Sequence, residues 1–279
     1  RTVPLLPLGG LMTKIKLVAV DLDDTMLSRE STITRRVKDA VAAVRAAGVY
    51  FTISTGRMYP SAARFARELE IDLPLIVYQG ALVKNSFSGE VLLYRPLPLA
   101  YAREIIKRVR EYGYHLNGYL DDRLLVERDS PEGRRYAATS GVELEVVKDL
   151  IAILDRDPTK LLVIAEEPQL DRLKADLDPV YRGKVHIVKS KPYFLEFSHI
   201  NATKGAALAY LAGYFGVHRE EIMAIGDSFN DLEMLEYAGV GVVVANAREE
   251  IKKIADYVTS QPYGEGVVEA LERFVLGHS

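Results

Sequence analysis

The alternation of short apolar runs with segments of helical periodicity constrains the fold of this chain more than any other feature of its sequence. The expected strands cover residues 15–20, 50–54, 75–78, 222–225 and 240–244. The expected helices are one that Thr34 caps and Gly48 ends, followed by residues 61–69, 204–215, 231–237, 249–254 and 266–275. Short runs that are apolar throughout are typical of strands buried on both faces of a parallel sheet. Strands that alternate with helices imply right-handed βαβ units, so the sequence predicts an α/β fold with a central parallel sheet.

The middle of the chain has a different character, in which this regular alternation is lost. A hairpin is expected at residues 81–94, with Ser88 and Gly89 at its turn. Further helices are expected at 100–112 and 170–177, and further strands at 124–127, 160–165, 185–188 and 194–197. We therefore expect a core formed by residues 12–83 and 191–279, with a smaller α/β cap, residues 84–190, inserted between them. Residues 1–11 are interpreted as an N-terminal extension.

Composition and charge exclude several classes of function. The 279 residues carry a formal net charge of −3 and include no cysteine. Disulfides, thiolate metal sites and cysteine nucleophiles are therefore excluded. The small negative charge gives no general attraction to nucleic acid, and no apolar run approaches the roughly 20 residues of a membrane-spanning helix. We expect a cytoplasmic protein with no nucleic-acid or membrane partner, whose affinity for any phosphate comes from a local site.

Acidic residues cluster directly after two of the expected strands. They are Asp21, Asp23 and Asp24 after the first strand, and Asp227 and Asp231 after the strand at 222–225. In open α/β sheets the functional site lies at the carboxyl ends of the strands. Two unit charges about 4 Å apart repel by about 4 kcal/mol at an effective dielectric constant near 20, so a divalent cation would offset the repulsion. Hard oxygen ligands favour Mg²⁺. Taken alone, however, the acids could also form a solvated turn or stabilise helix N-termini.

Two further segments have the groups that a phosphate needs. Ser54, Thr55, Gly56 and Arg57 follow the second expected strand and combine hydroxyls, a glycine amide and a guanidinium. Lys204 opens a helix, where a cation interacts unfavourably with the helix dipole and so requires another partner. Each segment alone could also be an ordinary loop or a solvent-facing lysine.

Together these segments resemble the haloacid dehalogenase superfamily of phosphohydrolases. The matching motifs are DLDDT at 21–25, STGR at 54–57, Lys204 and GDSFND at 226–231, in that order and each at a strand end or helix start. The position and size of the insert resemble the Cof-type branch of that superfamily. The resemblance covers the chain from Met12 onward. It implies a three-layer, Rossmann-like core and a Mg²⁺-dependent phosphomonoester hydrolase that acts on small phosphorylated metabolites, such as a sugar phosphate or a phosphorylated cofactor.

The resemblance also implies a role for each matching residue. Asp21 would be the nucleophile that forms an aspartyl-phosphate, and Asp23 the general acid and base. The residues expected to hold the phosphoryl group are Thr55, Gly56, Arg57, Lys204 and Asn230, of which Thr55 and Lys204 would also stabilise developing charge. The expected surroundings of Mg²⁺ are Asp21, the backbone carbonyl of Asp23, Asp227 and, through water, Asp231, which could instead orient Lys204.

Two residues depart from the family pattern. Asp24 stands where many members have glycine, and we expect it to face away from the metal. Gln79 stands where relatives often have asparagine, which puts a direct substrate role for it in doubt. Arg134 and Arg135, in the insert, are expected on a solvated helix face.

Two other functions fit the same acids. A phosphomutase would return the phosphoryl group to the substrate, and a non-enzymatic phospho-accepting regulatory module would keep it. Receiver modules are usually near 120 residues and have no cap, which counts against the second alternative. A monomer or small homo-oligomer is expected.

Overall fold

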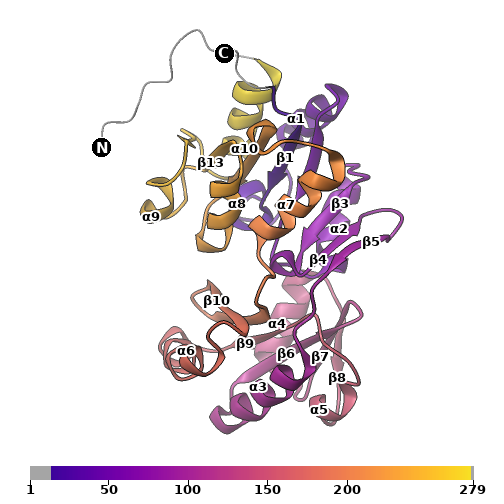
Figure 1. The fold of residues 1–279 in the computed structure, drawn as a ribbon, viewed down its shortest axis with the longest axis vertical. Helices are drawn as coiled ribbons and strands as arrows, with labels where there is room; N and C mark the ends of the chain where they lie inside the picture. Colours follow the sequence, from indigo (N-terminus) through magenta and orange to yellow (C-terminus); the bar gives the residue numbers. More distant parts are fainter. Residues whose placement is uncertain (1–13, 278–279) are drawn as a thin grey trace.

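The computed structural model describes residues 14–277, so the proposed extension at residues 1–11 lies outside the described residues (Figure 1). A five-stranded parallel sheet, in the order β14-β13-β12-β1-β2, forms the centre of the larger part. Its strands are β1 (Leu17–Val20), β2 (Tyr50–Ile53), β12 (Ile222–Gly226), β13 (Val240–Val243) and β14 (Tyr257–Val258). β1 lies between β2 and β12, with Val20 in register with both Ile53 and Ile225. The first and last thirds of the chain therefore form one sheet.

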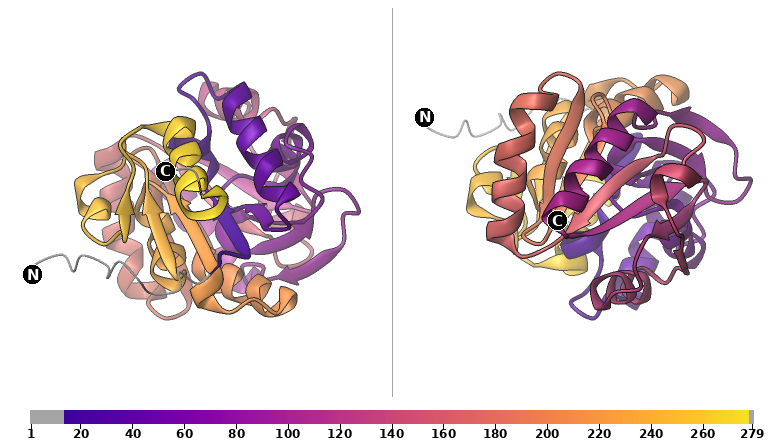
Figure 2. Two further views of the ribbon diagram at one scale, coloured as in Figure 1. Left: turned by 90° about the horizontal axis from the view of Figure 1, so that it is seen from above. Right: turned by 90° about the horizontal axis from the view of Figure 1, so that it is seen from below.

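Helices cover both faces of this sheet. Every residue of β1 is therefore buried between them. Val18 and Val20 belong to one apolar cluster, which includes side chains of α1 (Arg35–Ala46), α2 (Tyr59–Glu68) and α10 (Tyr263–Leu271). Leu17 and Ala19 belong to another, with side chains of α7 (Lys204–Phe215), α8 (Leu232–Tyr237) and α9 (Glu249–Lys252). Figure 2 shows α1 and α10 on one side of the sheet and α7 on the other. The predicted three-layer α/β core is confirmed.

The ends of α1 follow from its sequence. The Thr34 hydroxyl accepts a hydrogen bond from the Val37 amide at 3.3 Å, which satisfies one of the free N–H groups of the first turn. Gly48, just beyond the helix, has a φ of 78°, a conformation that glycine adopts without a steric cost. Both predicted ends of this helix are confirmed.

A small antiparallel sheet continues the core beyond β2. It contains β3 (Pro74–Val77), β4 (Leu82–Asn85) and β5 (Val91–Tyr94), and an isolated parallel bridge between Ser54 and Ile76 joins it to the β2 side. The predicted hairpin is therefore present as β4 and β5. Because β4 pairs with β3, we propose that the hairpin belongs with the core and not with the insert.

The second part of the molecule is a six-stranded sheet in the order β10-β11-β9-β6-β7-β8. Its strands are β6 (His115–Leu120), β7 (Arg123–Val126), β8 (Leu144–Val146), β9 (Lys160–Ile164), β10 (Val185–Lys191) and β11 (Phe194–His199). One face packs on α3 (Leu99–Tyr112), α5 (Leu150–Ile153) and α6 (Glu167–Tyr181). The other face packs on α4 (Pro131–Ser140), which lies between this sheet and the core (Figure 1). Strands β6 and β8 and the short helix α5 were not expected from sequence.

We call this second part the cap. Strand pairing favours limits of the cap that lie later in the chain than the predicted residues 84 and 190. At the first limit, β4 and β5 pair with the core; at the second, β11 pairs with β9 in the cap sheet. We therefore propose that the cap runs from about Leu97 to His199. Two segments of chain join it to the core (Figure 1). Within residues 14–277, no helix combines the length and the apolarity that crossing a membrane requires.

Candidate active site

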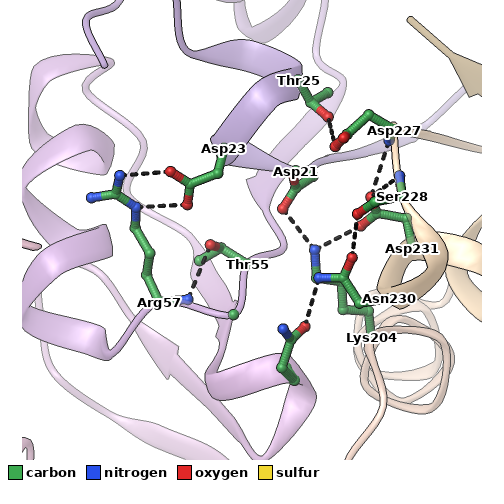
Figure 3. Close-up of polar contacts among 12 residues, drawn as sticks. Asp21, Asp23, Thr25, Thr55, Arg57, Lys204, Asp227, Ser228, Asn230 and Asp231 are labelled. Atoms are coloured by element: carbon green, nitrogen blue, oxygen red, sulfur yellow. Dashed lines mark hydrogen bonds and ion pairs between the residues drawn. The ribbon is translucent and has the colours of Figure 1, made fainter. Parts of the chain in front are cut away.

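The carboxyl ends of the parallel strands bring the predicted site residues together. Asp21 follows β1, Thr55 lies two residues beyond β2, and Asp227 follows β12. Lys204 is the first residue of α7 and reaches the same place. Figure 3 shows these side chains around one small space. Residues that lie more than 200 positions apart in sequence meet here: the Thr25 hydroxyl donates to Asp227 at 2.8 Å.

Lys204 forms the centre of the site. Its Nζ lies 2.6 Å from an oxygen of Asp21 and 2.6 Å from an oxygen of Asp231, and its side chain is fully buried. Burial alone favours the neutral amine, but the two carboxylates outweigh it and raise the pKa of Lys204 above its usual value. The lysine therefore stays an ammonium ion, and its position at a helix N-terminus is explained by the acids that face it.

Three carboxylates lie close enough to share a cation. One oxygen each from Asp21, Asp227 and Asp231 lie within 4.8 Å of one another. Burial, together with the neighbouring acids, raises the pKa of Asp21 well above its usual value, although Lys204 opposes the shift. Burial and Asp231 raise the pKa of Asp227 to about 7. One ammonium does not balance three carboxylates, of which Asp21 and Asp231 are buried and Asp227 is half-buried, and hard oxygen donors with excess negative charge fit Mg²⁺.

Asp231 differs from the other two acids in that both of its oxygens are already bonded. One accepts from Lys204, and the other accepts from the amides of Asp227 and Ser228 at 3.0 and 3.2 Å. This arrangement suits the predicted action through water or on Lys204. Asp24 is exposed and lies outside the three-carboxylate cluster.

Asp23 is held by Arg57. The guanidinium donates from Nη2 and Nε to the two oxygens of Asp23, at 2.7 and 2.8 Å (Figure 3). A third N–H of Arg57 reaches the hydroxyl of Ser61 at 3.1 Å. Burial favours the neutral acid, but the bonds and charge of Arg57 outweigh it and lower the pKa of Asp23. Arg57 was predicted to contact the substrate phosphate, whereas here its guanidinium binds Asp23. We therefore propose that it positions the general acid and base.

The segment after β2 forms a tight loop. Thr55 is buried, and its hydroxyl accepts from the Arg57 amide at 3.2 Å, which leaves its own proton to donate. A Cβ at Gly56 would lie 2.4 Å from the side-chain amide nitrogen of Gln79, so a larger residue there would displace the Gln79 side chain. Asn230 donates to the Gln79 side-chain oxygen at 3.1 Å. Gln79 therefore packs against two of the groups predicted to hold phosphate.

A cavity of about 1120 Å³ extends from these residues to the cap. The core contributes its floor, including Asp21, Thr55 and Asp227. The cap contributes apolar side chains and charged ones, the latter being Arg128, Asp129, Glu132, Arg135, Lys160, Glu166, Lys191 and Glu196. Arg134 is exposed and pairs with Asp129, as a solvated helix face implies, but its neighbour Arg135 lines the cavity. The cap residues on this wall were not predicted as site residues.

Comparison with known proteins places this geometry in a family. Residues 18–271 match the model of the haloacid dehalogenase-like hydrolases. The chain is 30% identical to the 5-amino-6-(5-phospho-D-ribitylamino)uracil phosphatase YitU of Bacillus subtilis, over 94% of this chain and 98% of that protein. It is 26% identical to the pyridoxal phosphate phosphatase YbhA of Escherichia coli, over 94% and 98% of the two chains. Its structure is similar to that of a haloacid dehalogenase-like hydrolase from Bacteroides thetaiotaomicron, with a TM-score of 0.86, 29% identity and coverage of 93% and 99%.

Proposed function

The chain belongs to the haloacid dehalogenase-like hydrolases, in their Cof-type branch, and is a phosphatase; on that premise we propose that it hydrolyses phosphomonoesters of small metabolites through an aspartyl-phosphate on Asp21. The observation that supports this most is the position of Lys204 between Asp21 and Asp231, beside Asp227. The arrangement fixes one oxygen of Asp21 on the ammonium and leaves its other oxygen to react.

The reaction would proceed in two displacements. In the first, the Asp21 oxygen attacks phosphorus, the P–O ester bond breaks, and the leaving oxygen takes a proton from Asp23. In the second, Asp23 removes a proton from water, which attacks phosphorus, releases inorganic phosphate and regenerates Asp21. Arg57 favours the ionised form of Asp23, which suits the second step. A dianionic phosphoryl group placed beside Asp23 favours the protonated form, which the first step needs.

The remaining residues would brace the phosphoryl group. Thr55 supplies a free hydroxyl proton, Gly56 a backbone amide, and Asn230 its side-chain amide, while Lys204 neutralises developing charge. Asp21, Asp227 and the backbone carbonyl of Asp23 would hold Mg²⁺, with Asp231 acting through water. When bound, Mg²⁺ would screen the negative charges of carboxylates and phosphate, so that two anions can meet.

The test is the release of inorganic phosphate from a panel of phosphorylated metabolites. Pyridoxal phosphate and a phosphoribitylaminouracil represent the chemistry named for the relatives, and several sugar phosphates extend the panel. Wild-type protein with Mg²⁺ should release phosphate, and chelation or Asp21→Asn should abolish release. Turnover by Asp21→Asn at the wild-type rate would refute the mechanism. Isomer formation without phosphate release would favour the phosphomutase instead. The cytoplasmic location and the oligomeric state stay predictions.

A further inference from the structure

A buried ion pair of the cap lies against the predicted phosphate pocket, and the mechanism above does not use it. Lys160, at the start of β9, and Glu196, in β11, are 1% and 4% exposed. Their charged groups are 2.5 Å apart. Although burial favours the neutral acid, the Lys160 ammonium outweighs it and lowers the pKa of Glu196, so Glu196 stays ionised.

Lys160 and Glu196 form hydrogen bonds with the core as well as with each other. Lys160 Nζ donates to the carbonyl oxygen of Gly56 at 2.9 Å. Glu196 accepts from the side-chain amide of Gln79 at 3.2 Å, and Gln79 in turn accepts from Asn230 at 3.1 Å. Gly56 and Asn230 are two of the groups proposed to donate to the substrate phosphate. Each is therefore one or two hydrogen bonds away from a buried charge of the cap.

Gln79 is the rigid link in this arrangement. Its φ of 59° lies in the left-handed region, where a non-glycine residue needs support from its surroundings. Its backbone amide donates to the Thr55 carbonyl at 3.1 Å, and its side chain leaves no room for a Cβ at Gly56. A shift of Glu196 would therefore move Gln79 against both Gly56 and Asn230.

A buried ion pair is weak evidence for stability, because desolvation of its two charges offsets most of their attraction. Its contacts with the core suggest a different purpose. Resting on the proposed function, we propose that Lys160 and Glu196 are positioning residues, which fix Gly56 and Asn230 for the phosphoryl group only when the cap is docked on the core. The phosphate pocket would then be complete only in the closed enzyme.

The test compares three proteins with Mg²⁺ present. Lys160→Met alone leaves Glu196 buried without a counter-charge and should lower the Tm. Lys160→Met/Glu196→Met removes both charges at similar volume and should restore the Tm to near the wild-type value. We expect this double variant still to lose about 10- to 100-fold in kcat/KM, because misplaced donors are costly in a transition state. It should also bind inorganic phosphate correspondingly more weakly.

A matched control separates positioning from simple docking of the cap. Lys84 and Asp122 form another ion pair between core and cap, 2.7 Å apart, which contacts neither Gly56 nor Asn230. Lys84→Met/Asp122→Asn should change kcat/KM by less than about threefold, because Asn keeps an acceptor for the Tyr78 hydroxyl that now bonds to Asp122.

A second readout does not depend on activity. In the double variant of Lys160 and Glu196, backbone amides of residues 54–58 and 228–232 should exchange hydrogen at least several-fold faster than in wild type and in the control variant. Recovery of both Tm and kcat/KM, or unchanged exchange in these segments, would overturn the proposal. Failure of wild-type protein to release or bind phosphate would refute the proposed function instead, and the exchange data would still decide the positioning role.

Discussion

Asp227 gives the site a pH dependence that can be measured without substrate. Its folded-state pKa of about 7 lies above the ordinary value of 3.8, because burial and Asp231 disfavour the carboxylate. A group whose pKa is higher in the folded protein than in the unfolded chain stabilises the folded state. This stabilisation is complete when the pH is below the pKa in the unfolded chain, and it is lost as the pH rises through the pKa in the folded protein. Metal-free protein should therefore lose about 3 kcal/mol from this group between pH 5 and pH 8.

Urea unfolding with a chelator would measure this effect. Because other groups also titrate, the informative quantity is the unfolding free energy of wild type minus that of Asp227→Asn at each pH. This difference should fall as the pH rises from 5 to 8. Added Mg²⁺ should stabilise wild type more at pH 8 than at pH 5, since the cation binds carboxylates. A difference that does not vary with pH would contradict the raised pKa.

A substitution of Arg57 can distinguish the two roles considered for its guanidinium, which are to position Asp23 and to bind the substrate phosphate. If it positions Asp23, Arg57→Met should lower kcat by about 10²-fold with little change in KM, because general acid–base catalysis typically contributes 10²–10⁴-fold. If it binds substrate phosphate, KM should rise instead. Arg64→Met is the control, since Arg64 also stacks on Phe65 but does not contact Asp23. Steady-state kinetics on one substrate would decide between the two roles.

The acids and Lys204 could be predicted from sequence because each directly follows a strand or opens a helix, where position alone fixes the side chain near the site. Which group each side chain binds could not be predicted in the same way. Whether Arg57 meets a phosphate or Asp23 depends on the path of the loop after β2. Lys160 and Glu196 lie inside expected strands, and only the three-dimensional sheet shows that they point toward Gly56 and Gln79.

At the scale of elements, the site depends on the close approach of the turn after β3 to the start of α7. A Cβ at Gly80 would lie 2.1 Å from the carbonyl oxygen of Thr203, and its φ is +93°. Gly80→Ala should therefore destabilise the protein by about 2–5 kcal/mol and displace Lys204, which follows Thr203. Activity should fall at least tenfold in the protein that remains folded.

Gly48→Ala is the matched control for this substitution. Gly48 also has a positive φ, +78°, but a Cβ there meets nothing within 4 Å. This variant should lose only about 1 kcal/mol of stability and keep wild-type kcat. Thermal unfolding and phosphate release together would test the pair. Equal activity of the two variants would show that the packing of Gly80 on α7 does not position Lys204.

The elements that sequence predicted best are those buried on both faces, because such strands are apolar throughout. β6 was missed because His115, Asn117 and Gly118 interrupt its apolar pattern. Asn117 is buried and bonds to His115 and Tyr119, a satisfied polar group that periodicity cannot distinguish from a loop. β8 and α5 are three and four residues long, too short for a periodic signal.

At the scale of the whole molecule, the order of motifs predicted that distant segments share one sheet, whereas the expected limits of the insert, residues 84 and 190, stay a prediction. An antiparallel hairpin next to an insertion point can pair with either part. Only the hydrogen bonds between β3 and β4 assign the hairpin to the core, and those between β9 and β11 assign β11 to the cap. The face of the cap that meets the core could not be deduced either, because α4 and α6 are both amphipathic.

That face lines the cavity above Asp21, so we expect it to limit which substrates the enzyme accepts. The cap lines one side of the cavity of about 1120 Å³ above Asp21, which is slightly larger than the roughly 300–1,000 Å³ of ordinary ligand pockets and has room for a small metabolite. Charged side chains of both signs line its cap side, so polar metabolites should bind better than purely aromatic esters. We expect kcat/KM for small phosphorylated metabolites to exceed that for a phosphorylated decapeptide by at least about 10²-fold, since the peptide prevents the cap from docking. Phosphate release from both, at equal Mg²⁺, would measure the ratio. Comparable rates would mean that the cap opens during the chemical steps, which contradicts a pocket completed by cap contacts.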